Sequence, residues 1–210
     1  QSITGIIIYG MSKEDKVLHR LISTGKFKCV VIDAPFVNVS TSCIGVDHRR
    51  AQYEVAAKTV MENNCKRILY IAGKRNGYVT DERIRGMEDL VKEKNLTMLV
   101  RNGEFSELQA RNITLKYAKN KDIVVCASDL MAIGAMKALI QMDIFRPVCG
   151  FDGIILMGYV GKQMNTVRQD FASISESAME ELQELMNGGY GRNIVMKHSL
   201  VRMKYEDIIA

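Results

Sequence analysis

The segment from Cys126 to Met136 most constrains the fold, because it is an apolar strand that ends where a helix begins. Residues 123–127 form a short β-rich run, and the apolar residues after it recur at helical spacing. Ser128 and Asp129 stand at the junction. Open α/β folds bind ligands at the carboxyl ends of parallel strands, so the junction predicts a carboxylate at a binding edge. Capping of the helix by Ser128 or Asp129 is an equally good interpretation, and the two roles are compatible.

The same alternation of strand and helix runs along the chain. Strands are expected at residues 3–9, 27–33, 66–72, 96–100, 123–127 and 147–151, and helices at residues 12–24, 49–62, 81–94, 106–119, 129–142 and 172–187. A β-like stretch at residues 194–204 follows. Repeated βα units predict the α/β class, with parallel sheets, right-handed crossovers and helices on both sheet faces.

The composition is that of a globular chain. Hydrophobic residues make up 47% of the 210 positions and charged residues 25%, with no apolar stretch of membrane-spanning length and no secretory signal at Gln1. The five cysteines are scattered and mostly lie in apolar runs, which favours a reducing cytoplasm over a disulfide framework. The net charge of +5 is not gathered into a basic block, so charge alone gives little support for nucleic-acid contact.

Catalytic motifs are not found in the sequence. His19, His48 and His198 are far apart, and the chain has neither a Gly-x-Ser-x-Gly elbow nor a phosphate-binding loop of the Gly-x-x-x-x-Gly-Lys-[Ser/Thr] type. No close spacing of His and Glu suggests a metal site. We therefore expect a binding protein without a metal or cofactor rather than an enzyme.

Eight short motifs follow one another along almost the whole chain. They are Gly45-Val-Asp47, Lys66-Arg-Ile-Leu-Tyr-Ile-Ala-Gly73, Glu82-Arg-Ile-Arg-Gly86, Gly103-Glu-Phe105, Ala127-Ser-Asp-Leu-Met-Ala132, Val148-Cys-Gly-Phe-Asp152, Thr166-Val-Arg-Gln-Asp170 and Ser199-Leu-Val201. In their order and spacing they resemble the lac/gal repressor (LacI/GalR) family of bacterial transcription regulators.

This resemblance implies a type I periplasmic-binding-protein-like fold, in which two doubly wound parallel-sheet subdomains enclose a ligand cleft. The amino-terminal subdomain is expected at residues 1–63 and 153–169, and the carboxyl-terminal one at residues 64–152 and 170–210. Residues 3–9 resemble the third strand of the family's amino-terminal subdomain, so we expect that subdomain to be incomplete here. The implied function is that of an effector-binding, dimer-forming core, and operator DNA would be bound only through a headpiece that this sequence lacks.

Arg83 and Asp129 are the first candidate ligand-binding residues. Arg83 begins an Arg-x-x-Gly motif at the start of a predicted helix, and its guanidinium offers five fixed donors. Asp129 offers only acceptors when ionised, so the two would form a donor-acceptor clamp. Without the resemblance, the favoured interpretation of Arg83 is a surface arginine that pairs with Asp81 or Glu82, and the resemblance reverses this order.

The other candidates are Phe105, Asp47 and Asp152. Phe105 matches the family position whose aromatic ring stacks on the ligand, although an isolated Phe is more often a core residue. Asp47 matches an acidic position at the cleft edge, but it also suits the N-cap of the next helix. Asp152 follows a strand where the chain crosses between subdomains, so it would contact ligand or fix the crossover by hydrogen bonding, and the second role is favoured.

Departures from the family pattern leave the effector open. Asn64-Cys65 replaces the usual Gly-His, Gly153 replaces a second Asp, and residues 163–166 replace the usual Pro-x-Leu-Thr-Thr. We expect a small polar effector, a sugar or sugar derivative, and a homodimer in the cytoplasm without a membrane partner. The alternatives are the solute-binding protein of a transporter, which would share the cleft, and an α/β enzyme, which would need a reactive constellation in it.

Overall fold

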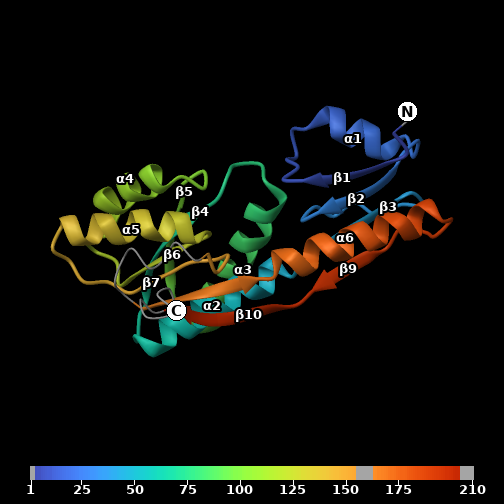
Figure 1. Ribbon diagram of the computed structural model, residues 1–210. Helices are drawn as coiled ribbons and strands as arrows, with labels where there is room; N and C mark the ends of the chain where they lie inside the picture. The colour runs from blue at the N-terminus through green and yellow to red at the C-terminus, as the bar shows by residue number, and fades with distance from the viewer. Residues whose placement is uncertain (1–2, 155–162, 204–210) are drawn as a thin grey trace. The chain divides into compact units, whose positions relative to one another are not determined.

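The structure is a computed structural model that describes residues 3–154 and 163–203 (Figure 1). These residues form two compact units. Unit 1 contains the described residues in the ranges 3–47, 76–79 and 170–197. Unit 2 contains those in the ranges 48–75, 80–154, 163–169 and 198–203. The chain thus passes between the units more than once, and each unit is assembled from segments that are distant in sequence.

Unit 1 is a parallel sheet with the strand order β1-β2-β3-β9. Its strands are β1 (Gly5–Tyr9), β2 (Lys28–Ile32), β3 (Thr41–Val46) and β9 (Asn193–Met196), and its helices are α1 (Lys16–Ser23) and α6 (Phe171–Met186). Val30 and Ile32 pack with α6, whereas Val31 and Ile8 pack with α1. Because successive side chains of β2 point to opposite faces, both faces of the sheet are covered.

Unit 2 is a larger sheet with the strand order β10-β8-β7-β6-β4-β5, in which only β10 is antiparallel to its neighbour. The strands are β4 (Arg67–Ala72), β5 (Thr97–Asn102), β6 (Ile123–Cys126), β7 (Val148–Cys149), β8 (Met164–Gln169) and β10 (His198–Met203). The helices are α2 (His48–Glu62), α3 (Tyr78–Lys94), α4 (Glu107–Tyr117) and α5 (Asp129–Gln141). None of the helices in the described part of the chain combines the length and hydrophobicity needed to cross a bilayer.

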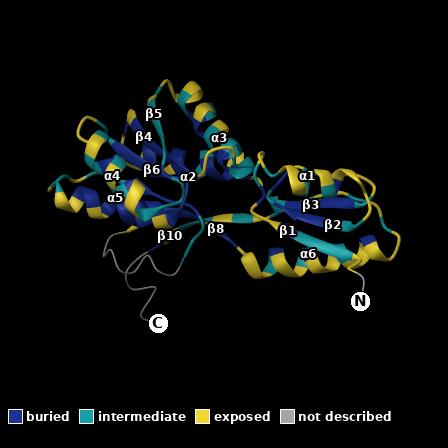
Figure 2. Ribbon diagram, turned by 90° about the horizontal axis from the view of Figure 1, so that it is seen from above, coloured by how far each residue is buried: buried dark blue, intermediate teal, exposed yellow. Residues whose placement is uncertain are grey.

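The core of unit 2 lies in its central strands. β6 and the part of β4 from Ile68 to Ala72 are buried throughout, as the dark blue strands of Figure 2 show. Figure 1 shows α5 and α2 on opposite sides of these strands. Central parallel strands covered on both faces need continuous apolar runs, and these are the runs that predicted them. The predicted α/β class with mostly parallel, doubly covered sheets is confirmed.

Two strands were not predicted, β3 and β8. β8 contains Asn165, Thr166 and Gln169, all buried, and its polar composition hides a strand that lies between β7 and β10. The predicted stretch 194–204 is two strands rather than one, since β9 pairs with β3 in unit 1 and β10 pairs with β8 in unit 2. Residue 204 lies outside the described residues.

The division into units differs from the predicted subdomains. α2, expected in the amino-terminal subdomain, packs on β7, β8 and β10 of unit 2. Residues 164–169 were expected there as well, but as β8 their backbone pairs with β7 and β10. α6, expected in the carboxyl-terminal subdomain, packs on β1, β2 and β3 of unit 1. These are contacts between distant segments, which local patterns do not encode. The part of the predicted boundary within residues 155–162 lies outside the described residues.

Candidate ligand-binding site

Arg83 occupies the centre of a polar cluster in unit 2. The residue lies on α3 and is 3% exposed. Its guanidinium stacks on the ring of Phe151, with Cζ 3.6 Å from the ring centroid. One guanidinium nitrogen donates to the carbonyl of Ala127, and another lies 3.7 Å from Oδ1 of Asp152. A planar guanidinium makes such stacking, hydrogen-bonding and ionic contacts at once, so its position is fixed from several sides.

His48 and Gln169 complete the cluster. His48 begins α2, and its Nδ1 accepts from Nε of Arg83 over 3.4 Å. Its ring is tilted against that of Phe151, with 5.8 Å between the ring centroids. Gln169 ends β8 and donates from Nε2 to Oδ1 of Asp152 over 3.0 Å. We call His48, Arg83, Phe151, Asp152 and Gln169 the Arg83 cluster.

The Arg83 cluster lies at the carboxyl edge of the unit 2 sheet. Ala127 directly follows β6, Phe151 and Asp152 follow β7 at a short distance, and Gln169 is the last residue of β8. Parallel strands end at a common edge, which is where open α/β sheets bind their ligands. Asp152 has a φ of +114°, a conformation that non-glycine residues rarely adopt and that occurs preferentially at functional sites.

Several buried polar atoms in or near the cluster have no hydrogen-bond partner among the described residues. They are Oγ1 of Thr80, Nε2 of Gln52 and Oε1 of Gln169. Thr80 lies one turn before Arg83 on α3, and Gln52 lies one turn after His48 on α2. Buried polar groups are nearly always satisfied by protein, water or ligand, because leaving them unpaired is costly. Their position at a sheet edge that suits ligands makes this part of unit 2 the candidate site.

Asp129 is fully buried and faces the loop that carries Asp152. Its Oδ1 accepts from Oγ1 of Thr166 over 2.6 Å, and its Oδ2 accepts from the backbone amide of Ile154 over 2.9 Å. A side chain at Gly150 would place its Cβ 2.2 Å from Oδ1 of Asp129, so this close approach requires glycine. Burial is the largest influence on the carboxyl and raises the pKa of Asp129 to about 7, although both hydrogen bonds act in the opposite direction.

This geometry separates the two roles that the sequence left open for Asp129. The α5 N-cap is Ser128, whose side chain accepts from the amide of Met131. Arg83 lies 3.7 Å from Asp152, and the clamp of Arg83 and Asp129 on a ligand stays a prediction. Asp129 instead holds the backbone just beyond Asp152, so its observed contacts are those of a positioning residue.

Phe105 and Asp47 are not among the residues of the Arg83 cluster. Phe105 is half-buried after β5, and a Cβ at Gly73 would meet its ring at 2.1 Å. It shares the carboxyl edge with the cluster, but β4 lies between β5 and β6. It also packs against the unit 2 core, as the core interpretation of this residue expected. Asp47 is exposed, belongs to unit 1 and directly precedes α2.

Sequence reasoning did not select Thr80, His48, Phe151 or Gln169 as site residues. A signal was present for most of them. Phe151 and Gln169 lie inside motifs that supported the family resemblance, and His48 directly follows another. Each also lies within two residues of a strand end, where this fold class places its binding groups.

Residues 57–205 match the family model of the periplasmic binding protein-like domain. The chain belongs to this family. Curated relatives of this periplasmic binding protein-like chain include the HTH-type transcriptional regulator MalR of Clostridium butyricum, 28% identical over 171 residues that cover 76% of this chain and 51% of the relative. The HTH-type transcriptional repressor PurR of Aliivibrio fischeri (strain MJ11) is 23% identical over 194 residues, which cover 87% of this chain and 57% of the relative. The chain spans little more than half the length of these relatives.

Solved structures show the same fold. The transcriptional regulator CelR-cellobiose complex superposes with a TM-score of 0.85 at 21% identity, covering 96% of this chain and 66% of that chain. The lac repressor dimer bound to operator and the anti-inducer ONPF gives a TM-score of 0.80 at 19% identity. This match covers 94% of this chain and 72% of the lac repressor chain. The predicted periplasmic-binding-protein-like fold and the predicted resemblance to the LacI/GalR family are both confirmed.

Proposed function

We propose that this chain is the effector-binding core of a LacI-type transcriptional regulator and that a small polar effector binds at the Arg83 cluster. The observation that carries the proposal is a buried guanidinium in a polar cluster at the carboxyl edge of the sheet, with three unpartnered polar atoms on the residues in or near that cluster. An ion pair with a purely structural role would not require unpartnered polar atoms beside it, at a sheet edge where this fold class binds ligands. The regulators among the curated relatives favour this role over that of a transporter component or an enzyme.

The chemistry of the cluster favours a neutral ligand rich in hydroxyl groups. Arg83 supplies donors, Asp152 supplies acceptors, and the amide of Gln169 and the hydroxyl of Thr80 supply both. A sugar hydroxyl donates and accepts at the same time, so a sugar ring or sugar derivative satisfies such a mixed set. The charges of Arg83 and Asp152 offset each other, which gives no advantage to a charged ligand. Cellobiose in the CelR complex is a ligand of this class.

Within this proposal, Asp129 acts through Asp152 rather than by touching the effector. Phe105 would offer an aromatic face at the same sheet edge, and Asp47 stays a candidate ligand contact because of its match to the family pattern. The regulator would be a cytoplasmic homodimer that binds operator DNA through a segment outside these residues. The effector would act by favouring one of two conformations of the core, which requires a coupling of a few kcal/mol, typically about 1–3.

The test is a screen of free and phosphorylated sugars by thermal shift, followed by calorimetry with the sugar that stabilises the protein most. Asp152→Asn should then weaken binding by about 10- to 100-fold, the usual loss for a hydrogen bond with a charged partner. The control is Asp89→Asn, which removes an exposed partner of Arg49 and should bind like the parent. Unchanged affinity in Asp152→Asn would contradict the assignment of the site.

A further inference from the structure

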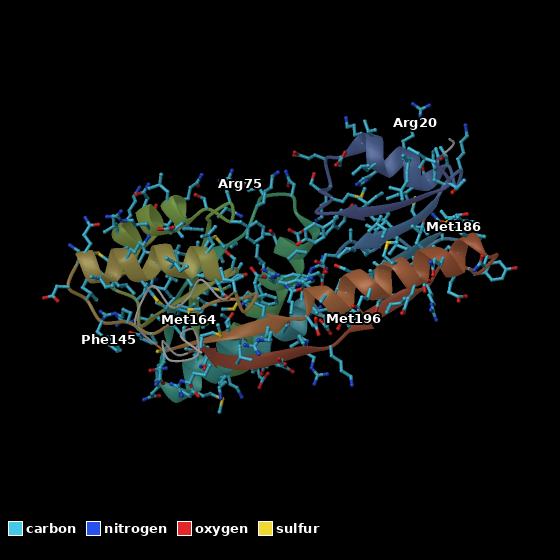
Figure 3. All side chains as sticks on the ribbon, viewed as in Figure 1. Arg20, Arg75, Phe145, Met164, Met186 and Met196 are labelled. Carbon is cyan, nitrogen blue, oxygen red and sulfur yellow. The ribbon has the colours of Figure 1, made fainter. Side chains whose placement is uncertain are left out.

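His48 is the titratable residue of the Arg83 cluster that lies directly against the guanidinium. It begins α2 and is 7% exposed. Its Nδ1 lies 3.4 Å from Nε and 3.3 Å from Nη2 of Arg83. The cluster occupies the end of β8 formed by Gln169, whereas Met164, labelled in Figure 3, begins the strand at its other end. Two guanidinium nitrogens therefore converge on one ring nitrogen at the carboxyl edge of the sheet.

This contact fixes the protonation state of His48. A guanidinium only donates hydrogen bonds, so the ring atom that faces it must be an acceptor. Nδ1 therefore carries no proton, and the neutral ring holds its proton on Nε2. An imidazolium ring has a proton on both nitrogens and can no longer accept. The contact between His48 and Arg83 thus exists only while His48 is neutral.

Protonation of His48 would place a second cation against Arg83. The carboxylate paired with the guanidinium is that of Asp152, at 3.7 Å, and it balances only one of the two positive charges. Asp129 holds the loop just beyond Asp152, and Asp47 directly precedes His48 in the chain. Two like charges 3.3 Å apart in a buried cluster repel each other, because little water screens them. Uptake of a proton would therefore push Arg83 away from His48.

Two other contacts of Arg83 do not depend on pH. Its face stacks on Phe151, and one nitrogen donates to the carbonyl of Ala127. Neither a phenyl ring nor a peptide carbonyl titrates, and the guanidinium itself stays protonated. An imidazole, in contrast, ordinarily takes up a proton at about pH 6.5. His48 is therefore the contact of Arg83 that a modest fall in pH can remove.

We propose that His48 is a positioning residue, which holds Arg83 for effector binding only while its imidazole is neutral, a role that rests on the proposed function of the cluster. Effector binding then weakens as pH falls through the range in which His48 takes up its proton. If the neutral form alone binds, the affinity falls by up to about tenfold for each pH unit below that range. Acidification would thus release the effector.

The first test needs no effector and is therefore independent of the proposed function. The histidine rings of the whole chain are labelled with ¹³C and ¹⁵N, and their spectra are recorded from pH 8 to pH 5. The chain has three histidines, and the signals missing from His48→Asn identify those of His48. We expect the Nε2–H tautomer at pH 8, protonation within this range, and a shift of the Arg83 Nε signal at the same pH. The Nδ1–H tautomer, or a ring that stays neutral until the chain unfolds, would overturn the proposal.

The second test measures binding by calorimetry at pH 7.5 and pH 5.5, with the sugar that gives the largest thermal shift in the screen. His48→Asn places an acceptor close to the position of Nδ1 and does not titrate, so it should lose less affinity than the parent at pH 5.5. His48→Leu has no acceptor and should bind about 10- to 100-fold more weakly than His48→Asn at pH 7.5. If His48→Leu does not fold, the comparison of the parent with His48→Asn decides the question.

The control is His198→Gln, which removes a ring of the same unit that contacts Glu54. It should keep the pH response of the parent, because His198 lies outside the Arg83 cluster. Asp129 also titrates in this range, with a pKa raised by burial to about 7, but it is present in all of these variants. The difference between the parent and His48→Asn therefore isolates His48. An equal loss of affinity on acidification in these two proteins would contradict the positioning role.

Discussion

The buried carboxyl of Asp129 should make the stability of the chain fall as pH rises through neutrality. Burial raises its pKa from an ordinary value of 3.8 to about 7. The folded chain therefore binds this proton more tightly than the unfolded chain does, and the contribution to stability is complete below about pH 4. It is lost as pH rises towards 7, because the folded protein must then hold a buried charge.

The magnitude follows from the width of this pH window. Each pH unit between the two pKa values changes the free energy of unfolding by about 1.4 kcal/mol. From pH 5 to about pH 7 the carboxyl is protonated in the folded chain and ionised in the unfolded chain. These two pH units give a loss of about 2.7 kcal/mol between pH 5 and pH 8. Other carboxylates with lowered pKa values, such as Glu181, change stability in the opposite direction below about pH 5.

The variant Asp129→Asn isolates this contribution, since the amide keeps an acceptor but does not titrate. Urea unfolding followed by circular dichroism at pH 5 and pH 8 should show the wild type losing about 2.7 kcal/mol relative to the variant. A ¹³C titration of the Asp129 side chain provides the direct measurement. An ordinary pKa near 4, or the same stability difference at both pH values, would refute the argument from burial.

Two further predictions concern packing and a buried ion pair. Gly134→Ala should destabilise the chain by about 1–3 kcal/mol in urea unfolding, because its Cβ would lie 2.1 Å from the carbonyl oxygen of Glu107 on α4. A variant as stable as the parent would contradict the close contact between α4 and α5. Glu181→Gln should destabilise unit 1 by about 1.5–3 kcal/mol at pH 7, because the buried carboxylate accepts from Ser42 and Arg192. These bonds lower the pKa of Glu181, so the difference should shrink as pH falls below about 4.5, and a difference independent of pH would exclude an ionic contribution.

The sequence by itself determined the order and type of most helices and strands. The helix expected at residues 129–142 is α5, Asp129–Gln141, and the apolar runs at β4 and β6 are central strands. These elements depend on spacing and composition within a few residues of each other, which the sequence displays directly. The motifs likewise led to the correct family, since they too are local and occur in a fixed order.

The tertiary structure decided which segments share a unit and which carboxylate faces Arg83. β8 is a buried strand despite its polar residues, because it lies between β7 and β10. Both neighbours are many residues away in the sequence. Asp152 rather than Asp129 pairs with Arg83, because Thr166 and the amide of Ile154 hold the Asp129 carboxyl. Both outcomes depend on pairings between segments distant in sequence, and the periodicity of one segment carries no information about its partner.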